Sequence, residues 1–376
     1  GFKVAVKDTP VAPFIYAAYA NWNNYRNRLF DNLKSSQNQA SINAMAIRRK
    51  QVLMSDSHQR WQQSNRTASW PMLDLSVVTH NSSQWIEEFT SSLLAQGDGP
   101  RVHLPAPTGI NPVSLTWMGL DSNMNFAGSI LIPDGGIEAD VWALNYNRFF
   151  AVGDRLAEIW VTGMGGSLDG FINIDSRRTV TASSSGLADP YLAMKIGLIG
   201  APARDPTRFN PTDYGFSLYA LAGLTLPWGD YDSKEALNLG TNRWSLRLGL
   251  PMTFAFGDRA ATWLELHPGM YIFGDNDDPF RADRRSQDEL FVLESHLSQN
   301  FTPKLWASLD LRYQYGGETT TDGVSDDNRL DQWGGGASVG YALSRSRSGF
   351  LGYAKIFGGN DDSNGDMWRA RLIFVF

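Results

Sequence analysis

A histidine and a serine lie two residues apart near the end of one extended segment of the chain. His296 and Ser298 share a face of that segment, and Asn300 follows them. A base beside a hydroxyl can support nucleophilic hydrolysis when both groups face the substrate. The opposite face carries Phe291, Leu293, Ser295 and Leu297. Because a lipid substrate would meet this apolar face, we expect no catalysis at His296 and Ser298, and the chain is predicted not to be an enzyme.

Carboxylate and guanidinium groups occupy the polar face of this segment and of the next one. If the turn NFTP joins the two as a hairpin, Glu294 lies opposite Asp310, and Arg312 is diagonal to both acids. His296 then lies opposite Ser308. Two carboxylates this close need a cation, which Arg312 supplies. The cluster is interpreted either as a selectivity site for a conducted solute or as a salt network that fills a narrow barrel.

Other side chains at the same alternate positions extend this interior surface. The candidates for lining a lumen are Lys195, Arg243, Arg247, Glu265, Glu294, His296, Asp310, Arg312, Arg369 and Arg371. The aromatic candidates are Trp160, Trp263 and Trp306. These tryptophans either form an aromatic lining for apolar solutes or pack against loops.

Alternation of apolar and polar residues at period two explains why these side chains share a face. LWASLDLRYQY (305–315) alternates in this way, and RWSLRLGLPM (243–252) and the C-terminal RARLIFVF (369–376) repeat the pattern. A tilted strand needs about 9 to 11 residues to cross a bilayer. Such segments could therefore place one face in lipid and the other in a lumen.

Twelve segments follow this rule. They span approximately residues 111–121, 137–150, 154–165, 188–200, 214–228, 241–257, 259–273, 287–300, 303–316, 331–344, 348–358 and 365–376. Connections after even-numbered segments are short, apart from 201–213. Connections after odd-numbered segments are long and polar, at 122–136, 166–187, 229–240, 274–286, 317–330 and 359–364. This sorting is typical of outer-membrane barrels. We predict an all-β transmembrane β-barrel of about 12 antiparallel strands; the alternative, a soluble β-sandwich, has no reason to sort its connections.

Composition excludes several other classes. The 376 residues include no cysteine and carry a formal charge of -6, which excludes disulfides, thiolate metal sites and a nucleic-acid footprint. No apolar run of about 18 residues occurs, which excludes a transmembrane helix. The acidic stretches 274–280, 319–331 and 358–366 lack EF-hand spacing and are interpreted as solvated loops beside lipopolysaccharide. We predict neither a metal nor a cofactor.

Residues 1–105 differ from the rest of the chain. They carry a charge of +4, against -10 for the remainder, and contain three stretches with apolar residues at helical spacing. We predict a helical N-terminal extension over 1–105, periplasmic or folded into the lumen, followed by the barrel over 106–376. The Gly- and Pro-rich stretch 97–109 is the predicted linker. The start lacks a signal peptide, as expected for a mature chain of the bacterial outer membrane or, alternatively, for a cytosolic protein.

Six motifs of the barrel region occur in an order that resembles one family. They are GLADP (186–190), GAPA (200–203), NLGTNRW (238–244), FGDNDD (273–278), LWASLD (305–310) and YGGETTTDG (315–323). The order resembles the outer-membrane transporter family named for the MetA pathway of phenol degradation, from about residue 105 to the C-terminus. The helical N-terminal part departs from that family's pattern. The resemblance implies an outer-membrane channel for small aromatic or otherwise hydrophobic compounds, with no catalytic residues to carry over.

We therefore predict an outer-membrane channel or transporter for small organic molecules. It would contact outer-membrane lipid, lipopolysaccharide and its solute, but no nucleic acid. The alternative is a membrane-anchored interaction protein in which residues 1–105 bind a protein partner. A third class, an outer-membrane hydrolase, would require His296 and Ser298 to face lipid.

Overall fold

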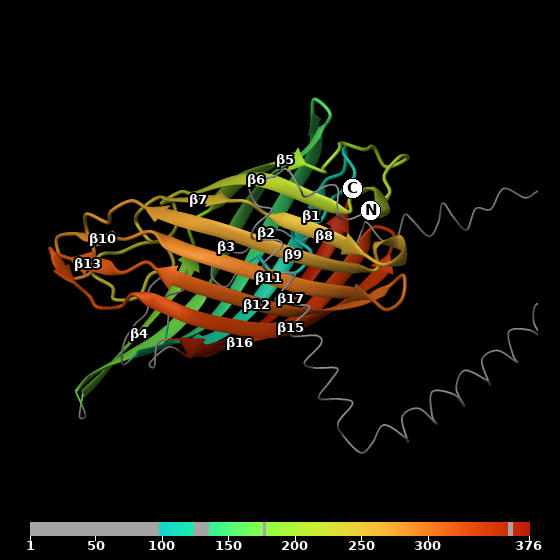
Figure 1. Ribbon diagram of the computed structural model, residues 1–376. Coiled ribbons are helices and arrows are strands. Elements are labelled where there is room, and N and C mark those ends of the chain that lie inside the picture. The colour runs from blue at the N-terminus through green and yellow to red at the C-terminus, as the bar shows by residue number, and fades with distance from the viewer. Residues whose placement is uncertain (1–97, 124–134, 176–177, 360–363) are drawn as a thin grey trace, which may run out of the picture. The chain divides into compact units, whose positions relative to one another are not determined.

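The described residues form a closed antiparallel β-barrel (Figure 1). The computed structural model describes residues 98–123, 135–175, 178–359 and 364–376. β1 (Pro112–Ser122) pairs with the last strand, β17 (Gly365–Val375), and β9 (Thr262–Phe273) pairs with β11 (Leu290–Asn300), which closes the wall. The wall has twelve strand positions, which confirms the predicted 12-stranded antiparallel barrel.

Ten further strands complete the wall. They are β2 (Gly135–Val152), β3 (Arg155–Asp175), β4 (Arg178–Leu187), β5 (Tyr191–Ile199), β6 (Phe216–Thr225), β7 (Ser245–Gly249), β8 (Met252–Phe256), β12 (Leu305–Gly316), β15 (Leu330–Ser344) and β16 (Arg347–Gly359). β4 and β5 share one position beside β3, and β7 and β8 share one between β6 and β9. Two short 3-10 helices, η1 (Pro211–Asp213) and η2 (Asp258–Ala260), lie in connections of the barrel.

A proline explains the break between β7 and β8. The sequence predicts one strand over 241–257, but the structure divides it at Leu250 and Pro251. Proline has no backbone N–H to donate to a neighbouring strand. The Pro251 carbonyl still accepts a hydrogen bond from the Tyr219 N–H, and the Leu250 N–H donates to the Pro268 carbonyl. The wall therefore stays closed across the interruption.

Three of the predicted loops contain strands. The prediction of a loop over 166–187 is wrong, because β3 and β4 pair from Gly165 and Leu187 out to Asp175 and Arg178 as one long hairpin. The predicted loops 274–286 and 317–330 contain β10 (Arg285–Gln287), β13 (Thr319–Thr321) and β14 (Val324–Ser325). These three form a small sheet at the end of the barrel opposite the C-terminus (Figure 1). The polar and glycine-rich composition of these stretches gave no strand pattern in the sequence. Their backbone groups nevertheless form hydrogen bonds with neighbouring strands.

The barrel is apolar outside and charged inside. Along β2, buried and exposed residues alternate, and the exposed ones include Trp142 and Leu144 at 53% and 58% exposure. Charged residues such as Lys195 and Glu265 are fully buried. An apolar outer band around a polar interior is the surface of a barrel that crosses a bilayer, as predicted. Among the described residues, no helix is long and apolar enough to span a membrane.

The predicted helical extension falls mostly outside the described part of the chain. Residues 1–97 are not described, so the helices predicted over 1–105 are neither confirmed nor contradicted there. All described residues belong to one compact unit, Asp74–Phe376. Residues 98–105 contain no helix among the described elements. The division at residue 105 stays a prediction.

Close packing of two strands predicts a position-specific effect of adding one methyl group. A Cβ on Gly340 of β15 would lie 2.1 Å from the Trp306 ring, whereas the nearest atom to a Cβ on Gly334 of the same strand is 3.5 Å away. Because Trp306 is buried and packed, we expect Gly340→Ala to cost about 1–3 kcal/mol of unfolding free energy. Gly334→Ala, measured in the same denaturant titration, should cost less than half as much. Equal costs would contradict this packing.

Candidate functional site

Residues 98–110, which we call the inner segment, run through the interior of the barrel. Residues 98–107 are all buried, and they contact inward-facing side chains of several wall strands. The prediction that 97–109 is a linker is therefore wrong for its described part. Gly99 has a φ of +87°, which favours glycine, and the bend brings Asp98 beside His103. Glycine and proline here permit a compact path through the lumen.

Apolar contacts fix the second half of the inner segment near the short turns. Leu104 packs in one cluster with Phe209, Tyr214 and Trp263. Ala106 and Ile110 pack in another cluster, which includes Phe149, Leu156 and Tyr219. The Thr108 N–H donates to the Arg204 carbonyl at 2.7 Å, in the connection between β5 and β6. The inner segment thus fills this end of the lumen.

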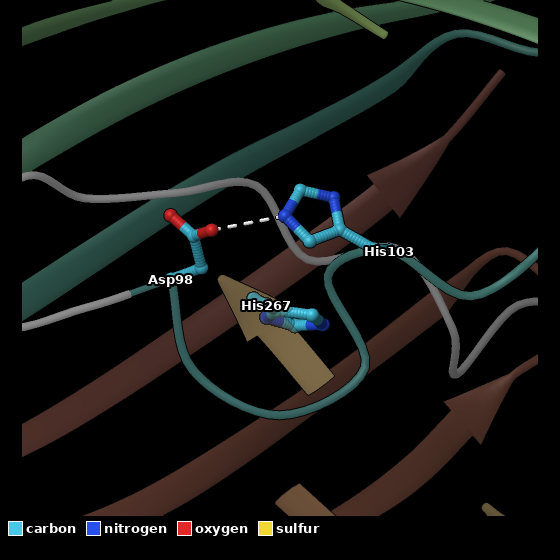
Figure 2. A group of neighbouring side chains, drawn as sticks. All are labelled: Asp98, His103 and His267. Atoms are coloured by element: carbon cyan, nitrogen blue, oxygen red, sulfur yellow. Dashed lines mark hydrogen bonds and ion pairs between the residues drawn. The ribbon is translucent and has the colours of Figure 1, made fainter. Parts of the chain in front are cut away.

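Asp98 is the most highly connected residue of the inner segment. Its carboxylate accepts two hydrogen bonds from the Arg247 guanidinium, at 2.6 and 2.5 Å, and lies 2.9 Å from His103 Nε2. Its N–H donates to Glu294 Oε2 at 2.8 Å, and its carbonyl accepts from Arg369 at 3.3 Å. Figure 2 shows the Asp98 and His103 contact, with His267 of the wall beside it. Asp98 and Arg247 form a buried, bidentate ion pair between the inner segment and the wall.

Arg101 is the second anchor. Its N–H donates to Glu265 at 2.6 Å, and its guanidinium lies 4.4 Å from the centre of the Trp306 ring. The same guanidinium donates to Ser298 Oγ at 3.2 Å and to the Asn300 side chain at 2.5 Å. Ser298 is buried inside the barrel rather than facing lipid. The orientation that a lipid hydrolase would need is therefore not found.

Acidic and basic groups alternate across β9, β11 and β12 in two rows of directly paired residues. The rows are Glu265, His296, Asp310 and His267, Glu294, Arg312. His296 Nδ1 lies 2.8 Å from Asp310, which also accepts a hydrogen bond from Ser338 at 2.8 Å. Arg312 Nε lies 3.9 Å from Glu294. Each carboxylate of the two rows thus has a histidine or arginine directly beside it on a neighbouring strand.

The predicted register of this hairpin is wrong, because each residue of β11 pairs with a residue two positions further along β12 than predicted. Glu294 pairs with Arg312, not with Asp310, and His296 pairs with Asp310, not with Ser308. The connection spans residues 301–304, one residue further along the chain than the predicted NFTP turn at 300–303. The Thr302 hydroxyl accepts hydrogen bonds from the N–H groups of residues 304 and 305, which opens the turn. The two carboxylates are therefore separated, and Arg312 is a direct partner of Glu294.

A second ion pair crosses β3 and β5. Lys195 Nζ lies 2.9 Å from Glu158, and both side chains are buried. The ammonium also lies 5.1 Å from the centre of the Tyr219 ring, within range of a cation–π contact. It donates at 3.5 Å to the carbonyl of Val102 in the inner segment. Wall and inner segment therefore meet through both charged and backbone groups.

All ten predicted charged candidates lie in the interior. Asp310 and Arg312 are half-buried, and the other eight are buried. Arg243 donates to Gln287, and Arg371 donates to Thr116 at 2.9 Å. Trp160, Trp263 and Trp306 are also buried, and none of the three lines the cavity described next. A role of these residues in solute passage stays a prediction.

A cavity of about 90 Å³ lies between the inner segment and the wall formed by β11, β12, β15, β16 and β17, and Glu294 and His296 of β11 line it. Gly99 and Pro100 form its inner side. The wall side combines the charged Asp310 and Arg312 with apolar groups such as Phe350. The cavity therefore offers hydrogen-bonding groups and an apolar surface at the same place.

Four residues of this site were absent from the sequence-based candidates. Asp98, Arg101 and His103 lie in a stretch without strand or helix periodicity, so no face could be assigned to them. His267, in contrast, lies two residues after Glu265 on the inward face of β9, and the alternation alone could have identified it. The inner segment is defined by tertiary contacts, which a periodicity analysis does not contain.

The outer acidic loops are held by an arginine. Arg284 lies against Asp275 and 3.7 Å from Asp277. A hydrogen bond to Asp275 and the charges of both carboxylates raise the pKa of Arg284. Within the described residues, the groupings of ligand-forming side chains that could hold a metal lie in the barrel interior and not in these loops. The loop over 274–286 is thus held by its own ion pairs.

Comparison with known proteins supports the fold and identifies a matching family. The family described as "Putative MetA-pathway of phenol degradation" matches residues 121–365. A crystal structure of an outer membrane channel from Pseudomonas putida F1 has a TM-score of 0.63 and 19% identity, and the alignment covers 74% of this chain and 99% of that chain. No curated protein sequence matches the chain.

Other barrels are less similar. The β domain of the Bordetella autotransporter BrkA has a TM-score of 0.43 and 10% identity over 70% of this chain and 98% of that chain. The transport unit of the autotransporter AIDA-I from Escherichia coli has a TM-score of 0.43 and 9% identity over 82% of this chain and 100% of that chain.

Proposed function

The chain belongs to the MetA-pathway phenol-degradation family, and from this premise we propose that it is an outer-membrane channel for small organic molecules. The observation that carries the proposal is a closed barrel whose charged interior holds an inner segment beside a cavity. A structural protein of this size gains nothing from burying so many ionisable groups, whose desolvation is costly. A passage for solutes needs polar groups along its wall.

The inner segment would control this passage. It contacts the wall at Asp98 and Arg101 and packs against apolar clusters near the short turns. Solute that enters from the long-loop end would reach the cavity beside Gly99 and would leave when the inner segment shifts. The first half of the inner segment is held by ion pairs and hydrogen bonds, which can be exchanged for water, whereas the apolar contacts of Leu104, Ala106 and Ile110 hold the second half in place.

The cavity favours a solute that has one hydroxyl and one apolar ring. Asp310 and Arg312 offer an acceptor and a donor, while Phe350 and Met367 offer apolar contact. The family description names phenol degradation, and phenol has this combination of groups. We infer that phenols, which carry a hydroxyl group on an aromatic ring, are the solute class of the channel.

Ion selectivity in planar bilayers tests the proposal. If the cavity lies on the conducting path, Arg312→Ala removes a positive charge from it, and the reversal potential should shift toward cation selectivity. Asp310→Asn should shift it toward anions. Arg345→Ala is the matched control, because Arg345 is exposed in a short turn outside the lumen. Unchanged reversal potentials of Arg312→Ala and Asp310→Asn in a protein that conducts would show that the cavity lies off the conducting path. A wild type that never conducts would contradict the channel and favour an interaction protein.

A further inference from the structure

Three histidines meet inside the barrel, although the whole chain has only five. The ring centres of His103 and His267 are 4.5 Å apart, and those of His267 and His296 are 5.4 Å apart. They come from the inner segment, β9 and β11, respectively. His267 lies between the other two, and Figure 2 shows it beside His103 and Asp98. This convergence is not required for a lumen wall, which could be filled by any polar residue.

Several ligand-forming atoms in this cluster have no hydrogen-bond partner among the described residues. Both ring nitrogens of His267 are in this state, although its side chain is only 1% exposed. The nearest carboxylate, on Glu265, is 3.4 Å from His267 Nε2. Nε2 of His296 and Oε1 of Glu294 also make no hydrogen bond; their charged neighbours, Glu294 Oε2 and Arg312 Nε, are 3.6 and 3.9 Å away. Buried polar atoms without partners are costly, so their presence in one place points to a ligand.

The partners of His296 orient its unpaired nitrogen toward that place. Nδ1 of His296 lies 2.8 Å from Asp310, which leaves Nε2 available beside Glu294 and His267. A carboxylate on one imidazole nitrogen and a metal on the other is the common arrangement at protein metal sites. Asp310 is itself held by Ser338, so the ring orientation is fixed in the absence of an ion.

We propose that His267, Glu294 and His296 bind one divalent transition-metal ion inside the barrel. Their ligand atoms lie within 4.8 Å of one another, and Glu294 and His267 are direct partners on neighbouring strands. Two imidazoles and one carboxylate are a ligand set of zinc sites that keep a fourth position open. With bonds of about 2.1 Å, side-chain shifts on the order of 1 Å complete the site.

The charges around the cluster select the kind of ion. Arg312 lies 3.9 Å from Glu294, Arg247 is paired with the neighbouring Asp98 carboxylate, and Arg369 donates to the Asp98 backbone carbonyl. Ca²⁺ and Mg²⁺ need several carboxylate or carbonyl oxygens and compete poorly in such surroundings. Imidazole nitrogens, in contrast, suit divalent transition metals such as Zn²⁺ and Ni²⁺. The site is therefore a transition-metal site. The argument for it does not depend on which solute the barrel conducts.

A metal at this position would also stabilise the inner segment. Glu294 accepts the Asp98 N–H at 2.8 Å through Oε2, which leaves Oε1 for the ion. A second grouping, Asp98, His103 and His267, shares His267 with the proposed one. The ion would thus fix the wall residue to which the start of the inner segment is bonded.

Cobalt binding to the metal-free, full-length protein tests the proposal. The chain is purified in detergent, freed of metal with EDTA and titrated with CoCl₂. One equivalent should produce visible Co²⁺ absorption bands, which ZnCl₂ then abolishes. His267→Gln and His296→Gln should each abolish stoichiometric binding, and Asp310→Asn should weaken it by about 10- to 100-fold.

Matched histidine variants separate this site from others. His103→Gln should retain one equivalent, as should a chain with both His58→Gln and His80→Gln. Heat-modifiable migration in gel electrophoresis verifies that each variant is folded. Absence of Co²⁺ binding by the wild type would overturn the proposal. Loss of binding in His103→Gln with retention in His296→Gln would also overturn it, because the ion would then belong to the Asp98 grouping.

Discussion

Arg247→Ala is expected to lower the unfolding free energy by about 3–5 kcal/mol and to increase channel conductance. Asp98 lies in the interior with 1% exposure, and Arg247 makes both of its strongest charge-assisted hydrogen bonds. Removing the guanidinium leaves a buried carboxylate whose nearest remaining side-chain partner is His103. The destabilised carboxylate, that of Asp98, belongs to the inner segment. The inner segment should therefore dissociate from the barrel wall more often. Urea unfolding in lipid vesicles and single-channel recording measure the two effects.

Arg243→Ala is the matched control for this prediction. Arg243 is buried four residues earlier, but its side chain donates to the neutral Gln287 and stacks on Phe273. Its loss removes no hydrogen bond to Asp98, and the inner segment keeps its anchor. Adding Asp98→Asn to Arg247→Ala should recover part of the lost stability, because the uncompensated charge is gone. Equal conductance in Arg247→Ala and Arg243→Ala would show that Arg247 does not hold the inner segment.

The strands were predictable because each one separates two different environments. Leu309 and Asp310 are neighbours in the chain, yet the first is 67% exposed on the outer surface and the second faces the interior. A strand in this position must alternate, since successive side chains point to opposite faces. The same argument placed all ten charged candidates inside the barrel. Alternation could not predict which residues on neighbouring strands these candidates pair with, because it fixes the face of a residue but not the register between strands.

Register and irregular segments depend on interactions that local pattern does not encode. The hairpin turns at 301–304, where the Thr302 hydroxyl accepts the N–H of Leu305, whereas the sequence predicted the turn one residue earlier. The inner segment has no period, and its position follows from contacts such as Asp98 with Arg247, 149 residues away. Local sequence therefore predicted the wall of the barrel and not the segment inside it.

The proposed metal ligands also could not be brought together from the sequence pattern alone. His267 could be placed inward by alternation, and Glu294 and His296 were already candidates. Their convergence required the direct pairing of β9 with β11 and the orientation of His296 by Asp310. A spacing rule for metal ligands fails here because His267 lies on β9, 27 residues before Glu294 and 29 before His296 on β11. Such sites are found only when the register is known.

Leu309→Arg is expected to cost about 2–4 kcal/mol of unfolding free energy in a lipid bilayer. Leu309 lies near the middle of β12, between Leu297 and Ala337 on the two neighbouring strands. A guanidinium at this position would enter the hydrocarbon region, where it has neither water nor an anion to bind. Reversible urea unfolding in phospholipid vesicles measures the cost directly.

Val324→Arg supplies the matched control, since Val324 is 68% exposed, almost the same fraction as Leu309. It lies in β14 of the small outer sheet, which is surrounded by water if the barrel is inserted as proposed. Surface substitutions of this kind usually stay within about 0.5 kcal/mol. Because the two positions are equally exposed, a difference between their unfolding free energy costs reports whether lipid or water surrounds them. In a soluble barrel both costs would be those of a water-exposed surface. A small cost at Leu309 equal to that at Val324 would mean that β12 meets water, and the membrane assignment of this face would fail.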